Sequence, residues 1–123
     1  MKNDKKLLSL ELAKKMKELG FKQKSLWWWI VVRKGEVELM EYSQLTMLEC
    51  NTLHAYNRIC SAYTVAELGE MLPKGYVTSK NILLLNTWNC WKLYSSPQNI
   101  IEADTEANAR AKMLIYLKEE GKI

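Results

Sequence analysis

A run of three tryptophans, Trp27-Trp28-Trp29, limits the structures open to this chain more than any other feature. It lies in the stretch 26–33, which is aromatic or β-branched almost throughout and is therefore typical of a β-strand. Successive side chains of a strand point to opposite faces, so Trp28 must face away from Trp27 and Trp29. Whatever covers one face of this strand, at least one indole has to be accommodated on the other.

The strand needs partners. Lys34-Gly35 is a plausible tight turn, and residues 36–42 look like the antiparallel return strand. Residues 88–94 alternate in polarity and predict another strand, while 76–79 and 100–103 predict short extended pieces. Residues 43–63 carry a broken helical pattern and are expected to be irregular or partly helical.

Three segments carry helical signals. The first runs from an N-cap at Ser9 to Gly20, and the second begins with a capping box of Thr64 and Glu67 and stops before a proline. The third, 105–120, is apolar around most of its circumference and is expected to cover the sheet, with Ala111 and Leu114 nearly inaccessible. The chain is thus expected to be a single α+β domain spanning 1–123. A long C-terminal helix packs a small antiparallel sheet of three or four strands, with an N-terminal helix and a short middle helix.

Membrane and export signals are lacking in the sequence. The longest apolar run, 26–32, is far shorter than the roughly 20 residues that cross a bilayer, and the lysine-rich start leads into no apolar signal core. The expected location is the cytoplasm, with no membrane partner. Cys50, Cys60 and Cys90 are odd in number and widely spaced, so they predict free thiols and no disulfide framework.

Catalytic and metal-binding patterns are also weak. The single histidine, His54, lies one helical turn from Cys50, but no orienting group for a Cys–His pair is recognisable. One histidine and dispersed cysteines give no ligand pair at structural-zinc spacing, and the scattered glycines form no phosphate-binding loop. We therefore expect no enzyme activity, no catalytic residues, no metal and no cofactor.

Two surfaces could bind a partner. Tryptophans on an open sheet face can anchor a protein or stack on bases, whereas the more conservative interpretation is that they are core. The candidate aromatic surface comprises Trp27, Trp28, Trp29, Trp88 and Trp91. Residues 1–24 hold eight lysines against three acidic residues, and Lys6, Lys14 and Lys17 form a candidate basic face on the first helix.

These surfaces leave two classes of function open. The first is a non-catalytic protein that binds a protein partner, with a second copy of the chain as one form of partner. The alternative is a nucleic-acid-associated protein, which requires the lysines and an exposed tryptophan on one side of the molecule.

Three stretches, starting at Ser9, Thr64 and Glu102, carry a resemblance: SLELAKKMKELG, TVAELGEMLP and EADTEANARAKMLIYL. Together they resemble a group of short uncharacterised proteins encoded in phages and prophages of Gram-positive and gut bacteria. The resemblance implies a bacterial cytoplasm and an accessory role in a phage life cycle. It carries over no catalytic residues and implies no mechanism.

Overall fold

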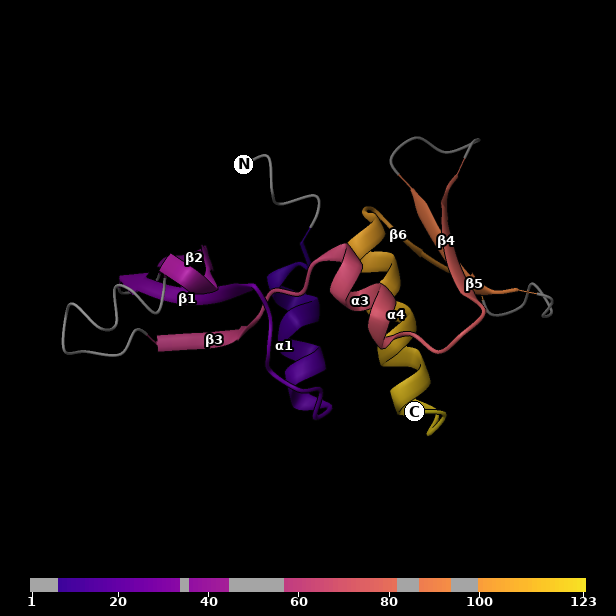
Figure 1. The fold of residues 1–123 in the computed structure, drawn as a ribbon, viewed down its shortest axis with the longest axis horizontal. Coiled ribbons are helices and arrows are strands. Elements are labelled where there is room, and N and C mark those ends of the chain that lie inside the picture. Colours follow the sequence, from indigo (N-terminus) through magenta and orange to yellow (C-terminus); the bar gives the residue numbers. More distant parts are fainter. Residues whose placement is uncertain (1–6, 34–35, 45–56, 82–86, 94–99) are drawn as a thin grey trace.

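The computed structural model describes residues 7–33, 36–44, 57–81, 87–93 and 100–123. Within them, helices form a central layer between two small antiparallel sheets (Figure 1). The α+β class expected from the sequence is confirmed. No described helix is both long and apolar enough to cross a membrane.

The first sheet has the strand order β2-β1-β3. Its centre is β1 (Trp27–Arg33), flanked by β2 (Glu36–Glu41) and β3 (Asn57–Ser61). The β1–β2 pairing confirms the expected hairpin, and its register places Trp28 opposite Met40. Beyond the last ladder pair, where residues 42–44 turn helical, the backbone N–H of Tyr42 donates to the carbonyl of Leu26 at 2.6 Å.

The expectation that 43–63 is irregular or partly helical holds for residues 43 and 44, which are helical, but strand β3 corrects it for 57–61. Its five residues are extended, and four of them pair with β1; the register shifts between Trp29 and Ile30, which leaves Ile59 without a partner in the ladder. The helical pattern of apolar residues across 43–63 did not indicate this strand, because its conformation depends on pairing with a distant segment. Residues 45–56 and the turn at 34–35 lie outside the described residues.

The second sheet has the order β4-β5-β6, formed by Tyr76–Lys80, Trp88–Lys92 and Ile101–Ala103. The sequence predicted these extended segments but placed all strands in one sheet. The long helix α4 (Glu106–Glu119) packs on this second sheet. The first sheet instead meets α1 (Leu10–Glu18) through β3, so α4 does not cover the tryptophan-rich strand as expected.

The helix ends follow the predicted caps. Ser9 Oγ accepts from the backbone N–H of Leu12 at the start of α1, and Gly20 has a φ of 89° just beyond its end. The short helix α3 (Val65–Met71) begins with the capping box of Thr64 and Glu67. Thr105 caps α4 in the same way, through the N–H of Asn108.

Helix α4 contributes to two cores, which explains why it is apolar on nearly all sides. One face packs with α1, α3 and β3 through Ala107, Ala111, Leu114 and Ile115, which belong to the first core. The other packs with the second sheet through Ala109, Met113 and Leu117, which belong to the second core. Ala111 and Leu114 are fully inaccessible, as the sequence predicted.

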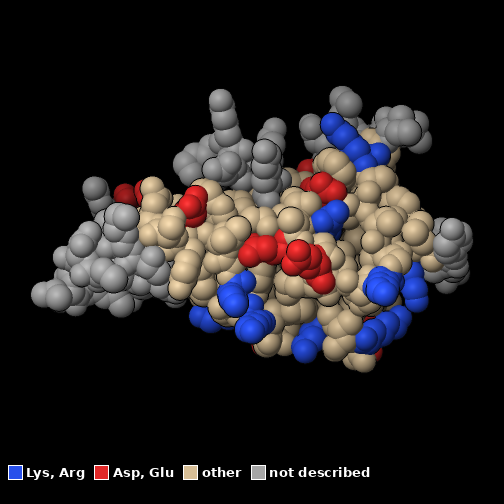
Figure 2. All heavy atoms as spheres, in the orientation of Figure 1, with Lys and Arg blue, Asp and Glu red and all other residues tan. Residues whose placement is uncertain are grey.

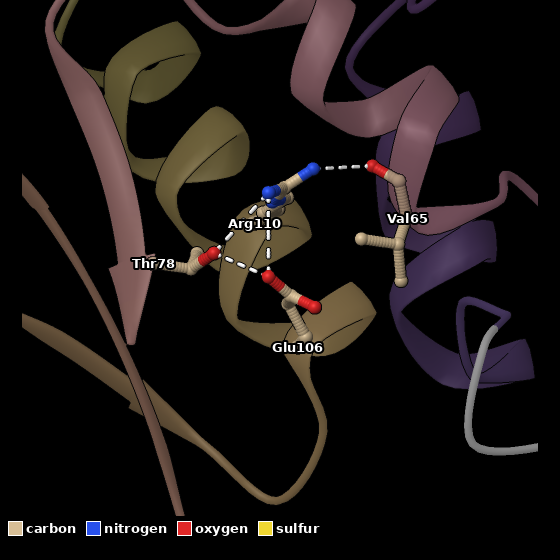
Figure 3. Close-up of polar contacts among 4 residues, drawn as sticks. All are labelled: Val65, Thr78, Glu106 and Arg110. Carbon is tan, nitrogen blue, oxygen red and sulfur yellow. Dashed lines mark hydrogen bonds and ion pairs between the residues drawn. The ribbon is translucent and has the colours of Figure 1, made fainter. Parts of the chain in front are cut away.

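Arg110 joins the helical layer to the second sheet (Figure 3). Its Nη1 donates to the Val65 carbonyl at the start of α3 (2.7 Å), and its Nη2 donates to Thr78 Oγ1 on β4 (3.2 Å) and to Glu106 Oε2 (3.3 Å). The Thr78 hydroxyl donates to the same Glu106 oxygen at 2.6 Å. The guanidinium lies against Gly69 of α3, where a Cβ atom would be only 2.4 Å from Nη1.

Candidate functional site

The candidate site is a pocket where the segment between α1 and β1 passes the start of α3. It has a volume of about 590 Å³ and is lined by residues 22–26, Trp28, Tyr42 and Glu67. We call it the Leu26 pocket. Its size falls within the range typical of ligand-binding cavities in proteins.

Two exposed apolar side chains stand at this pocket. Leu26 is 61% exposed and Tyr42 is 45% exposed, the two largest values among the exposed large hydrophobic side chains of the described residues. The hydrogen bond from the Tyr42 N–H to the Leu26 carbonyl holds the two backbones together just beyond the β1–β2 hairpin pairing. Leu26 directly precedes β1, and both Leu26 and Trp28 line the pocket.

Trp28 forms part of the pocket wall. The residue is only 8% exposed and packs with Ile30, with Met40 alongside. Its indole Nε1 donates to the Ser25 carbonyl at 3.1 Å, which holds the ring against the backbone of the pocket. A buried indole beside exposed Leu26 and Tyr42 gives the pocket an apolar wall next to an apolar rim.

Hydrogen bonds to Glu67 and with Ser25 fix the backbone conformation at the pocket. The Ser25 hydroxyl donates to Glu67 Oε1 at 2.7 Å and accepts from the backbone N–H of Trp27 at 3.2 Å. Glu67 Oε1 also accepts from the N–H of Thr64 at 2.9 Å, and Oε2 accepts from the N–H of Leu26 at 3.2 Å. Both carboxylate oxygens are therefore engaged in holding α3 against the start of β1.

The segment behind the pocket is tied to the first core. The Tyr63 hydroxyl donates to the carbonyl of Lys22, and the side chain of Gln23 accepts from the N–H of Ser61 at 2.7 Å. Burial raises the pKa of Tyr63 to about 12, so this hydroxyl keeps its proton at neutral pH. Hydrogen bonds therefore fix the 22–26 segment of the pocket, whereas the side chains of Leu26 and Tyr42 are exposed to solvent.

The structure does not bring the predicted tryptophans together. Trp29 is half-buried against the first core, where its Nε1 donates to the Leu8 carbonyl at 3.2 Å, and Trp27 is half-buried on the same face of β1. Trp88 and Trp91 lie on opposite faces of β5 in the second sheet. Only Trp28 lines the Leu26 pocket, and the remaining lining residues were not among the site residues predicted from the sequence.

The candidate basic face is partly engaged in internal contacts. Lys14 and Lys17 are exposed on α1, and the Lys17 ammonium donates to the Ile59 carbonyl at 2.7 Å; Lys6 lies outside the described residues. Basic side chains gather along the lower edge of the molecule (Figure 2), where α1 and α4 both end (Figure 1). Lysine near a helix C-terminus is favoured by the helix dipole, and Lys15 pairs with Glu119 at 3.7 Å between the two helices.

The described cysteines are buried. Burial raises the pKa of both thiols, that of Cys90 to about 11, so they hold little thiolate at neutral pH. Among the residues that the structure describes, no group of three or more His, Cys, Asp and Glu is placed to hold a metal ion. Cys50 and His54 lie outside the described residues, and the expectation that they form no site stays a prediction.

No model of a known protein family, no curated protein and no solved structure matches this chain.

Proposed function

We propose that this chain is a non-catalytic binding protein that recognises a protein partner at the Leu26 pocket. The observation that carries the proposal is the exposed, backbone-bonded pair of Leu26 and Tyr42 at a pocket with the Trp28 indole in its wall. Scattered exposed apolar residues are common on soluble proteins, but an adjacent pair beside an apolar pocket is typical of an interaction site. As an accessory factor of a phage or prophage, the chain would bind a host or phage protein there.

A binding role is supported by the chemistry of the pocket. Its one described carboxylate, Glu67, accepts hydrogen bonds at both oxygens from Ser25, Leu26 and Thr64. A general base needs an oxygen directed at its substrate, whereas these two accept from the Ser25 hydroxyl and from two backbone N–H groups. The exposed side chains at the pocket are suited to contact with a partner and carry no nucleophile that is activated by a neighbour.

The nucleic-acid alternative has less support. Stacking on bases needs an accessible aromatic ring near the lysines, and no tryptophan is among the exposed large hydrophobic side chains of the described residues. Several lysines lie at helix C-termini, where the dipole disfavours a phosphate group.

Site-specific photo-cross-linking tests the proposal. p-Benzoylphenylalanine replaces Tyr42 in the full chain, and the same probe at Leu93, which is 41% exposed next to the second sheet, is the matched control. After irradiation in a bacterial host extract, we expect protease-sensitive adducts from the Tyr42 position. Leu26→Ser should abolish them, and the Leu93 position should not give them.

Each other outcome has a defined meaning. Equal labelling from both positions would contradict a specific site at the pocket. Adducts removed by nuclease would favour the nucleic-acid alternative, and adducts at twice the mass of the chain would identify a second copy as the partner.

A further inference from the structure

The electrostatics of the Leu26 pocket are asymmetric. Lys22 and Lys24 line it, and neither ammonium group has an acidic partner or a hydrogen bond among the described residues. Glu67, the only carboxylate among the described residues that line it, accepts from three donors and lies in the first turn of α3, where the helix dipole offsets its charge. The charge available to an incoming ligand is therefore positive.

The apolar part of the pocket is held in place before any ligand binds. The backbone of Leu26 donates to Glu67 and accepts from Tyr42, so both of its peptide polar groups are engaged. Trp28 is anchored through its indole N–H to the Ser25 carbonyl. Binding of a ligand to these side chains therefore requires little further ordering of the backbone. This preorganisation lowers the entropic cost of binding.

From this combination we propose that the pocket binds an acidic peptide segment with an aromatic or aliphatic anchor residue. The anchor packs against Leu26, Tyr42 and Trp28, and flanking Asp or Glu side chains face the ammonium groups of Lys22 and Lys24. The inference rests on the proposed function, because it specifies the chemistry of the partner at the same site. A pocket of about 590 Å³ has room for one large side chain and its neighbours.

A displayed library of short random peptides tests this chemistry. The full chain is the target, and peptides that also bind the Leu26→Ser, Tyr42→Ser double variant are removed. We expect the remaining peptides to share an aromatic or aliphatic residue flanked by Asp or Glu. Their affinity for the unmodified chain should fall as NaCl is raised, because exposed charge pairs are screened.

Charge reversal provides the matched comparison. Lys22→Glu with Lys24→Glu should weaken binding of the selected peptides by about tenfold or more. Lys74→Glu with Lys80→Glu changes the net charge equally at exposed lysines that do not line the pocket, and should leave the affinity within about twofold.

The outcomes separate the two proposals. Pocket-dependent peptides that are neutral or basic, or that respond equally to both charge reversals, would overturn the acidic-segment inference and leave the binding site standing. Recovered peptides that bind the Leu26→Ser, Tyr42→Ser variant as tightly as the unmodified chain would overturn both. Failure to recover any pocket-dependent peptide would overturn the acidic-segment inference, while the cross-linking result decides the proposed function.

Discussion

At the scale of single residues, Ser25 links the pocket to α3 through a short side chain. Its hydroxyl bonds to Glu67 and to the backbone N–H of Trp27, and the residue is buried. Ser25→Ala removes both bonds at a buried position, which should lower the free energy of unfolding by about 1–3 kcal/mol. Urea unfolding measures the change. Ser43→Ala removes a solvent-exposed hydrogen bond to Glu41, which water can replace, and should stay within about 0.5 kcal/mol; an equal effect of the two would contradict the role of Ser25.

Gly69 and Arg110 form a coupled pair. Gly69→Ala brings a methyl group within 2.4 Å of the present position of Arg110 Nη1, so the guanidinium must leave the Val65 carbonyl. Lost charged hydrogen bonds outweigh the helix-propensity gain of about 1 kcal/mol for replacing glycine, so the variant should be destabilised. In an Arg110→Ala background the conflict is absent, and the same change should stabilise by about 0.5–1 kcal/mol.

A double-mutant cycle of these variants by urea unfolding measures the coupling directly. We expect an interaction energy of about 1–2 kcal/mol between the two positions. Additive effects would show that the guanidinium can move aside without losing its hydrogen bonds.

The residues of the pocket show which parts of a site a sequence can indicate. Glu67 was identifiable as a cap because its partner, Thr64, lies three residues away. Its bonds to Ser25 and Leu26 join segments about 40 residues apart, and no local pattern signals them. The exposure of Leu26 was equally invisible, since its apolar character favoured a buried strand.

At the scale of elements, local signals predicted the helices and most strands, but not their pairing. Caps at Ser9, Thr64 and Thr105 mark helix starts because their hydrogen bonds are local. Strand β3 and the division into two sheets depend on contacts between distant segments. A short stretch of sequence does not contain the partner, so its local pattern cannot indicate the pairing. The apolar circumference of α4 was visible in the sequence, although the reason for it, two separate cores, was not.

The two faces of α4 should respond differently to truncation. Leu114→Ala opens a cavity in the first core and Met113→Ala in the second, and each should cost about 2–5 kcal/mol in unfolding free energy. Amide hydrogen exchange distinguishes them. Leu114→Ala should speed exchange most in α1 and α3, and Met113→Ala most in β5 and β6, because these elements lose the packing concerned. Identical exchange patterns would indicate one undivided core.

At the scale of the whole molecule, the helical layer joins two cores, each of which contains at least one buried titratable side chain. Tyr63 and Cys60 belong to the first core, and Cys90 belongs to the second. Burial raises the pKa of all three groups, because the charged form is poorly solvated inside the protein. Folding therefore favours the protonated state of each group, and the two cores should respond to alkaline pH in the same direction.

The sign of this dependence follows from the unfolded values. The pKa of Cys90 rises from 9.0 to about 11 and that of Tyr63 from 10.0 to about 12, so between these limits the unfolded chain releases protons that the folded chain retains. The stabilisation is complete below pH 9 and is lost as pH rises through 9–12, at up to about 1.4 kcal/mol per pH unit for each group. Titration of these groups should therefore leave the urea midpoint nearly constant around neutral pH and lower it steeply above pH 9.

Tyr63→Phe lowers stability at neutral pH by removing the bond to Lys22, but it should flatten the fall in the urea midpoint between pH 10 and 12. A profile for Tyr63→Phe as steep as that of the unmodified chain over this interval would show that Tyr63 does not hold its proton more tightly when folded.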